Sequence, residues 1–125
     1  MEYLEIMNKP MIGNSVNKKK SVENIRLHLT QQFNLPLEQI DMLLPSFIAT
    51  LGTHMSNLEN ALAEKNPVLL GKVGHTIKGA FLNLGLHDCA QIALVIEEKG
   101  GHGGNIAEFG KLIEDLRLLI RPVLE

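Results

Sequence analysis

His75 stands between two lysines, at a spacing that places all three residues on one side of an α-helix. With about 100° of turn per residue, Lys72 and Lys78 lie one turn before and one turn after His75. Gly71 and Gly79, at positions i−4 and i+4, leave the two nearest helical neighbours of the imidazole without side chains. A neutral imidazole is a nucleophile and lysines bind phosphoryl oxygens, so these residues could carry a phosphoryl group. The same spacing also fits an ordinary surface histidine among solvated lysines.

The opposite side of this helix is apolar, which indicates that His75 faces solvent. Glycine inside a helix costs about 0.5–1 kcal/mol relative to alanine. Gly71, Gly74 and Gly79 therefore need another explanation, and we favour the close approach of a second surface to the histidine. The apolar positions are Leu69, Leu70, Val73, Ile77, Ala80, Phe81 and Leu84.

The residues that follow His75 resemble a known family, the histidine-containing phosphotransfer (HPt) domain of multistep phosphorelays. The family pattern is approximately His-x-(Leu/Ile)-Lys-Gly-(Ser/Ala), followed by Asn-Leu-Gly. The helical periodicity extends the likeness over roughly residues 35–122. Gly74 departs from the pattern, since alanine is frequent there, and the N-terminal third has no motif to compare. The matching residues are His75, Ile77, Lys78, Gly79, Ala80, Asn83, Leu84 and Gly85.

The resemblance implies that His75 acquires a phosphoryl group on Nε2 and exchanges it with an aspartate of a receiver domain. The receiver supplies Mg²⁺, so we expect this domain to need no metal or other cofactor of its own. Phosphoryl transfer depends mainly on positioning and charge stabilisation. A helix without an acid–base pair could therefore serve, as a phosphoryl carrier rather than as an enzyme.

Three side chains are expected near the imidazole of His75. Lys72 and Lys78 each lie three residues from His75 and are expected to screen phosphoryl oxygens. Lys78 is the lysine of the motif, whereas Lys72 is inferred from its position on the helical wheel. The resemblance suggests that Glu97, on the following helix, hydrogen-bonds the imidazole. An acceptor there would hold Nδ1–H and leave Nε2 to attack. A glutamate at the edge of a helix is also commonly just solvated.

The docking surface for a receiver is expected on the exposed face of the same helix and part of the preceding helix. Val68 and Leu82 lie on the solvent side and bracket His75, while Gly71 and Gly79 give the partner room. Two apolar residues in these places could form the rim of a transient interface, which is commonly smaller than about 1,200 Å². Isolated exposed apolar residues also occur without any function.

Length and composition limit the class of protein. The 125 residues predict one domain, and 45% apolar with 21% charged residues is typical of a folded globular chain. The net charge of −2 gives no reason to expect nucleic-acid binding. No apolar run approaches the ~20 residues that span a membrane. The N-terminus lacks the pattern of a signal peptide, and the single cysteine fits a reducing compartment. We therefore expect a cytoplasmic protein.

Two other kinds of site were considered. His54, His87, His102 and Cys89 could suggest a metal, but no pair has the spacing of a structural zinc site. The glycines at 100–104 do not form a phosphate loop, because the Gly-Lys-Ser/Thr ending is absent and a helix precedes them. Without a nucleotide motif, autonomous kinase activity is not expected.

Apolar periodicity and turn residues predict an all-α fold, an antiparallel four-helix bundle with an additional N-terminal helix. Residues 1–20 are interpreted as a flexible arm and 21–125 as the bundle domain. Ser21 is expected to cap the first helix, and Pro45 to separate a short helix from the long one that follows it. Gly100–Gly104 is expected to be a flexible connector. The predicted helices cover 22–33, about 36–65 with a break near Pro45, 67–84, 87–99 and 106–121.

Three functional readings remain open at this level. The favoured one is a phosphotransfer protein that relays a phosphoryl group between receiver aspartates. The second is a helical-bundle adaptor that binds a signalling partner without accepting phosphate. The third is a domain excised from a larger histidine kinase.

Overall fold

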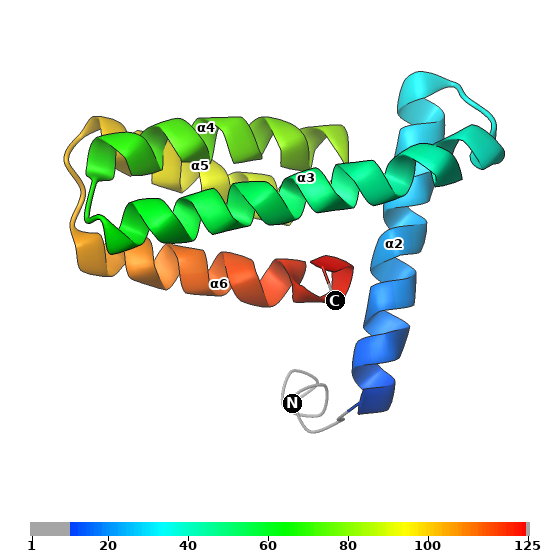
Figure 1. Cartoon of the computed structure of the whole chain (residues 1–125), viewed down its shortest axis with the longest axis horizontal. Helices are drawn as coiled ribbons and strands as arrows, with labels where there is room; N and C mark the ends of the chain where they lie inside the picture. The colour runs from blue at the N-terminus through cyan, green and yellow to red at the C-terminus, as the bar shows by residue number, and fades with distance from the viewer. Residues whose placement is uncertain (1–10, 125) are drawn as a thin grey trace.

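Four helices of this chain run antiparallel along a common axis, and a fifth crosses one end of them (Figure 1). The computed structural model describes residues 11–124, with side chains described from Lys20 onward. Within that range every element is helical, which confirms the predicted all-α bundle with an additional N-terminal helix. No helix there is long and apolar enough to cross a membrane. The helices are α2 (Met11–Phe33), α3 (Leu37–Ala63), α4 (Pro67–Asn83), α5 (His87–Gly101) and α6 (Ile106–Leu124).

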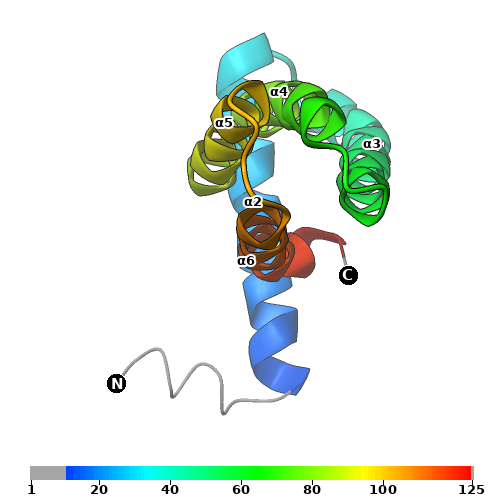
Figure 2. The ribbon, with the colours of Figure 1, turned by 90° about the vertical axis from the view of Figure 1, so that its left-hand side faces the viewer.

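The core lies between the four antiparallel helices and continues beneath α2. Viewed along the bundle axis, α5, α4 and α3 form an arc that faces α6, and α2 lies behind them (Figure 2). Each helix contributes its predicted apolar face, because residues three and four apart share a side of a helix. The largest fully buried side chains are Ile25, Leu29, Ile40, Leu51, Leu58, Leu70, Ile77, Phe81, Ile96, Phe109, Ile113 and Leu116.

Both ends of α4 are formed by the residues that predict them. The side chain of Asn66 accepts a hydrogen bond from the backbone N–H of Leu69 at 3.1 Å, and Pro67 occupies the first helical position. At the other end Gly85 has a φ of +75°, a left-handed conformation that favours glycine. The helix that carries His75 therefore has defined limits.

Two prolines lie inside helices, where the sequence predicted ends. Pro45 does not break α3, which is continuous from Leu37 to Ala63, and Pro122 lies within the last turn of α6. Proline removes one helical hydrogen bond and costs about 3 kcal/mol in a helix interior. Around Pro45, burial of Leu44 on one side and Leu51 on the other keeps both parts of α3 on one core. The buried Val123 does the same beyond Pro122.

The first helix begins earlier than predicted. It starts at Met11, so residues 11–20 are helical rather than part of an arm, and Ser21 lies inside the helix instead of capping it. Lysine is a good helix former, and Lys18, Lys19 and Lys20 therefore continue the helix backwards at little cost. The remaining part of the predicted arm, residues 1–10, lies outside the described residues.

The glycine-rich segment Gly100–Gly104 is only partly a connector. Gly100 and Gly101 form the last turn of α5, and Gly100 is buried. The N–H of Gly104 donates to the carbonyl of Lys99 at 2.8 Å, which closes the end of the helix. Backbone contact with α4, described below, explains why Gly100 belongs to the helix.

Helix α2 is joined to the bundle by apolar and ionic contacts. Ile25 and Leu29 are fully buried in the common core. The guanidinium of Arg26 binds Asp41 of α3 through two hydrogen bonds, of 2.7 and 3.1 Å. This carboxylate is also the first cause of a raised pKa of Arg26. The helix is therefore part of the packed structure.

Truncating the buried face of α2 is expected to destabilise the whole bundle. Leu29→Ala should lower the free energy of unfolding by about 2–5 kcal/mol, because Leu29 is 0% exposed. Leu27→Ala, at a side chain 53% exposed on the same helix, should change it by less than about 0.5 kcal/mol. Urea unfolding followed by circular dichroism measures both. Equal effects of the two substitutions would contradict the packing described here.

The buried cysteine on α5 is expected to be unreactive. Burial, helped by the neighbouring Asp88, raises the pKa of the Cys89 thiol from 9.0 to about 11. Its thiolate is therefore about 100-fold scarcer than that of a free thiol, and iodoacetamide should alkylate the native protein at least 100-fold more slowly than the urea-unfolded chain. The thiol's contribution to stability should persist below pH 9 and be lost as the pH rises toward about 11. A native rate equal to the unfolded one would contradict this.

Candidate functional site

His75 projects from the middle of α4 into solvent. Its side chain is 69% exposed, whereas Leu70, Ile77 and Phe81 on the opposite face of the helix are fully buried. The face of α4 that the apolar pattern predicts to be buried is therefore the face that is buried. Exposure leaves the imidazole accessible to a visiting group.

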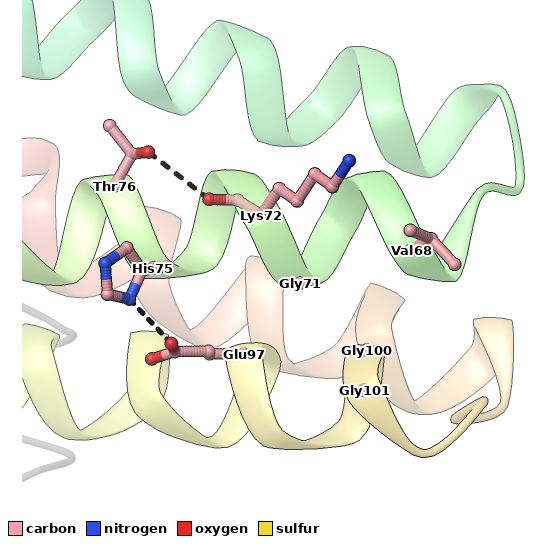
Figure 3. A pocket seen from close by; sticks show the side chains of 8 residues that line it. All are labelled: Val68, Gly71, Lys72, His75, Thr76, Glu97, Gly100 and Gly101. Carbon is pink, nitrogen blue, oxygen red and sulfur yellow. Dashed lines mark hydrogen bonds and ion pairs between the residues drawn. The ribbon is translucent and has the colours of Figure 1, made fainter.

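Glu97 of α5 connects the imidazole to a lysine. Its Oε2 lies 2.6 Å from Nδ1 of His75, and its Oε1 accepts a hydrogen bond of 2.6 Å from Nζ of Lys78 (Figure 3 shows the first of these contacts). The hydrogen bond from Lys78 and then that from His75 lower the pKa of Glu97, so it is ionised at neutral pH. An ionised carboxylate only accepts hydrogen bonds, so Nδ1 carries the proton. In the neutral ring Nε2 then has the free lone pair.

The two lysines that flank His75 in sequence behave differently. Lys78 is held by its ion pair with Glu97, and its side chain is only 23% exposed. The side chain of Lys72 extends along α4 away from His75 (Figure 3). The structure thus brings Lys78 into the site and leaves Lys72 at its margin.

The two glycines that bracket His75 also differ. A Cβ at Gly79 would meet no heavy atom within 4 Å outside its own stretch of helix, so the surface beside it is open. Gly71 instead is buried, and a Cβ there would lie 3.1 Å from Cα of Gly100. We expected Gly71 to leave space for a docking partner, and the structure corrects this expectation. The missing side chain of Gly71 instead lets α5 approach α4.

An open depression of about 700 Å³ lies beside the imidazole, between α4 and α5. Val68, 62% exposed, stands at its rim, and Leu82, 46% exposed, lies on the other side of His75. Thr76 also lines it and was not predicted, although its place next to His75 in the sequence could have indicated it. The full lining is Val68, Gly71, Lys72, His75, Thr76, Glu97, Gly100 and Gly101.

The other four histidines and Cys89 do not line this depression. The rings of His28 and His87 meet edge to face with centroids 6.1 Å apart, where α2 crosses the turn between α4 and α5. Cys89 is buried in the core. Among the side chains described, from Lys20 to Leu124, no three His, Cys, Asp or Glu residues cluster as a metal site requires.

Comparison with known proteins agrees with this geometry. The family model of the Hpt domain matches residues 42–123, which include α4, α5, all but the last residue of α6 and most of α3. No curated protein and no solved structure matches the chain significantly. Hpt domains serve histidine phosphotransfer in phosphorelays, as phosphoryl-carrier modules that interact with receiver domains. The match covers about two thirds of the chain, and the protein therefore belongs to the Hpt domain family.

Proposed function

We propose that this protein relays a phosphoryl group between His75 and aspartates of receiver domains. The observation that carries the proposal is the solvent-exposed imidazole whose Nδ1 is held by Glu97 at 2.6 Å. That hydrogen bond fixes the ring and directs the lone pair of Nε2 outward. A nucleophile of this kind needs a partner that brings the phosphoryl group, since no nucleotide motif occurs in the sequence.

In the transfer step the lone pair of Nε2 attacks the phosphorus of an aspartyl phosphate. The N–P bond forms as the bond from phosphorus to the aspartyl oxygen breaks, and the carboxylate leaves with the bonding electrons. No proton has to leave Nε2, because the proton of the ring is on Nδ1. The phosphorylated ring is cationic, and Glu97 neutralises it across the Nδ1 hydrogen bond. The reverse step returns the group to an aspartate, and we expect the receiver to supply Mg²⁺ for both directions.

Lys78 compensates for the negative charge of Glu97. A lone carboxylate beside the imidazole would repel the arriving phosphoryl group, because like charges at such distances interact unfavourably. The ion pair of 2.6 Å between Lys78 and Glu97 largely cancels this repulsion while the carboxylate still accepts from His75. Lys72, which is exposed and points away, could turn toward the phosphoryl oxygens only after a change of rotamer.

The receiver is proposed to dock on the exposed face of α4. Val68 and Leu82 provide exposed apolar contacts on either side of His75, and Gly79 leaves open space one turn after it. Gly71 contributes to this face only at the floor of the depression beside His75. Apolar contacts around one exposed nucleophile suit a small and transient interface.

Replacing the histidine tests the relay directly. His75→Gln should lose all phosphoryl acceptance from a phosphorylated receiver domain, because no other side chain replaces Nε2, while the fold and the binding of the receiver persist. The label on the wild type should be acid-labile and base-stable, and mass spectrometry after alkaline work-up should place it on His75. His102→Gln, in the loop before α6, is the matched control and should be labelled normally.

The outcomes of this experiment separate the alternatives. An adaptor would bind the receiver and take up no label in the wild type, so His75→Gln would change nothing. Label that persists in His75→Gln would assign the chemistry to another histidine. Either result would overturn the proposed function.

Removing the carboxylate is expected to slow transfer without abolishing it. The hydrogen bond to the charged carboxylate stabilises the cationic ring, but His75 is exposed and water can replace part of that interaction. Glu97→Ala should therefore reduce the transfer rate about tenfold. The transfer rate of Glu97→Gln should lie between those of the wild type and Glu97→Ala, because its amide oxygen can accept from Nδ1–H but carries no charge. Stopped-flow or quenched-flow transfer assays measure all three, and an unchanged rate in Glu97→Ala would contradict the role given to Glu97.

A further inference from the structure

We propose that Gly71 and Gly74 of α4 and Gly100 of α5 are positioning residues for phosphoryl transfer. They hold the backbone of Glu97 against α4, close enough for its carboxylate to reach Nδ1 of His75. The inference rests on the proposed function of His75, and it concerns how the accessory carboxylate is placed.

The backbone of Glu97 lies directly on the two glycines of α4. A Cβ at Gly74 would lie 3.1 Å from the backbone nitrogen of Glu97, and a Cβ at Gly71 would lie 3.4 Å from its backbone oxygen. The contact at Gly74 is already tight for a methyl group, and the contact with Glu97 at Gly71 would be an ordinary van der Waals contact. Any side chain larger than a methyl group at either position would push α5 outward. The glycines therefore set the distance between α4 and the main chain of Glu97.

Gly100 closes the same contact one helical turn further along α5. A Cβ there would lie 2.5 Å from Cα of Gly71, 2.7 Å from its nitrogen and 2.8 Å from the carbonyl oxygen of Pro67. All three atoms belong to the backbone, so no rotamer change could relieve the clash. Residues three apart lie on the same side of a helix, so a shift of α5 at Gly100 also displaces Glu97.

The hydrogen bond is sensitive to such a shift. The distance from Glu97 Oε2 to Nδ1 of His75 is 2.6 Å, and a hydrogen bond is lost beyond about 3.5 Å. Separating the helices by about 1 Å would therefore release the imidazole while the bundle remains folded. Because the ring is exposed, no packed neighbour would then fix its tautomer.

A double-mutant cycle distinguishes positioning through Glu97 from general damage to the fold. Gly100→Ala should reduce the rate of transfer from a phosphorylated receiver about tenfold, the same factor as loss of the Glu97 hydrogen bond. In the Glu97→Ala background the Gly100→Ala substitution should have no further effect, because the contact that it disturbs is already absent. Gly110→Ala, on α6 and outside the site, is the matched control, since a Cβ at this helical glycine would meet no neighbouring atom within 4 Å.

The tautomer of His75 gives a second readout that loss of stability alone would not change. Nitrogen-15 NMR of the imidazole at a pH where the ring is neutral should show Nδ1–H in the wild type and in Gly110→Ala. Gly100→Ala and the milder Gly71→Ala should show a mixture of both tautomers. Gly71→Ala keeps the test decisive if Gly100→Ala does not fold, because the closest atom to its added methyl would be 3.1 Å away rather than 2.5 Å.

Two results would overturn the inference. One is a pure Nδ1–H tautomer with a wild-type transfer rate in Gly100→Ala or Gly71→Ala. The other is a further loss of rate when Gly100→Ala is added to Glu97→Ala. A wild type that accepts no phosphoryl group from a receiver would instead refute the proposed function, and the NMR experiment would still decide whether the glycines place Glu97.

Discussion

Backbone contact between α4 and α5 is the constraint on which the site depends. An imidazole that is mostly exposed has no surrounding core to hold it, so its orientation comes from the single carboxylate of Glu97. That carboxylate in turn is placed by main-chain atoms lying against Gly71 and Gly74. Glycine is unfavourable inside a helix by up to about 1 kcal/mol per residue. These glycines lie where α4 and α5 must approach closely enough for a short hydrogen bond to form between Glu97 and His75.

The charges of the site follow from the same arrangement. Glu97 is shared by His75 and Lys78, which come from one helix at positions three apart and therefore lie on the same side. The lysine lowers the pKa of the carboxylate and balances its charge, so that the group can accept from Nδ1 without opposing an incoming anion. Position and charge are both supplied before any partner arrives, which is the contribution that phosphoryl transfer requires from a protein.

Periodicity was sufficient to predict the helices and the side of α4 on which His75 lies, because it reports which residues of one helix share a face. It could not report which neighbour a face meets. Gly71 was therefore expected to make room for a partner, whereas it packs on Gly100. The expected break at Pro45 was wrong for a related reason. Local rules give the cost of a proline, and tertiary burial of Leu44 and Leu51 outweighs that cost. The expected cap at Ser21 was wrong because the helix continues back to Met11.

Helix α2 lies outside the Hpt family match, yet it contacts the turn that ends the histidine helix. The ring of His28 lies so close to Gly85 that a Cβ there would be 2.6 Å from Cγ of His28, and only a glycine leaves space for it. Leu29 adds a fully buried side chain to the core beside it. The turn that ends the helix of His75 thus lies against α2, and the first half of the helix packs against α5 through its glycines. An exposed nucleophile gains a fixed position in this way, because the helix that carries it is restrained on both sides of the reacting residue while the residue itself stays free.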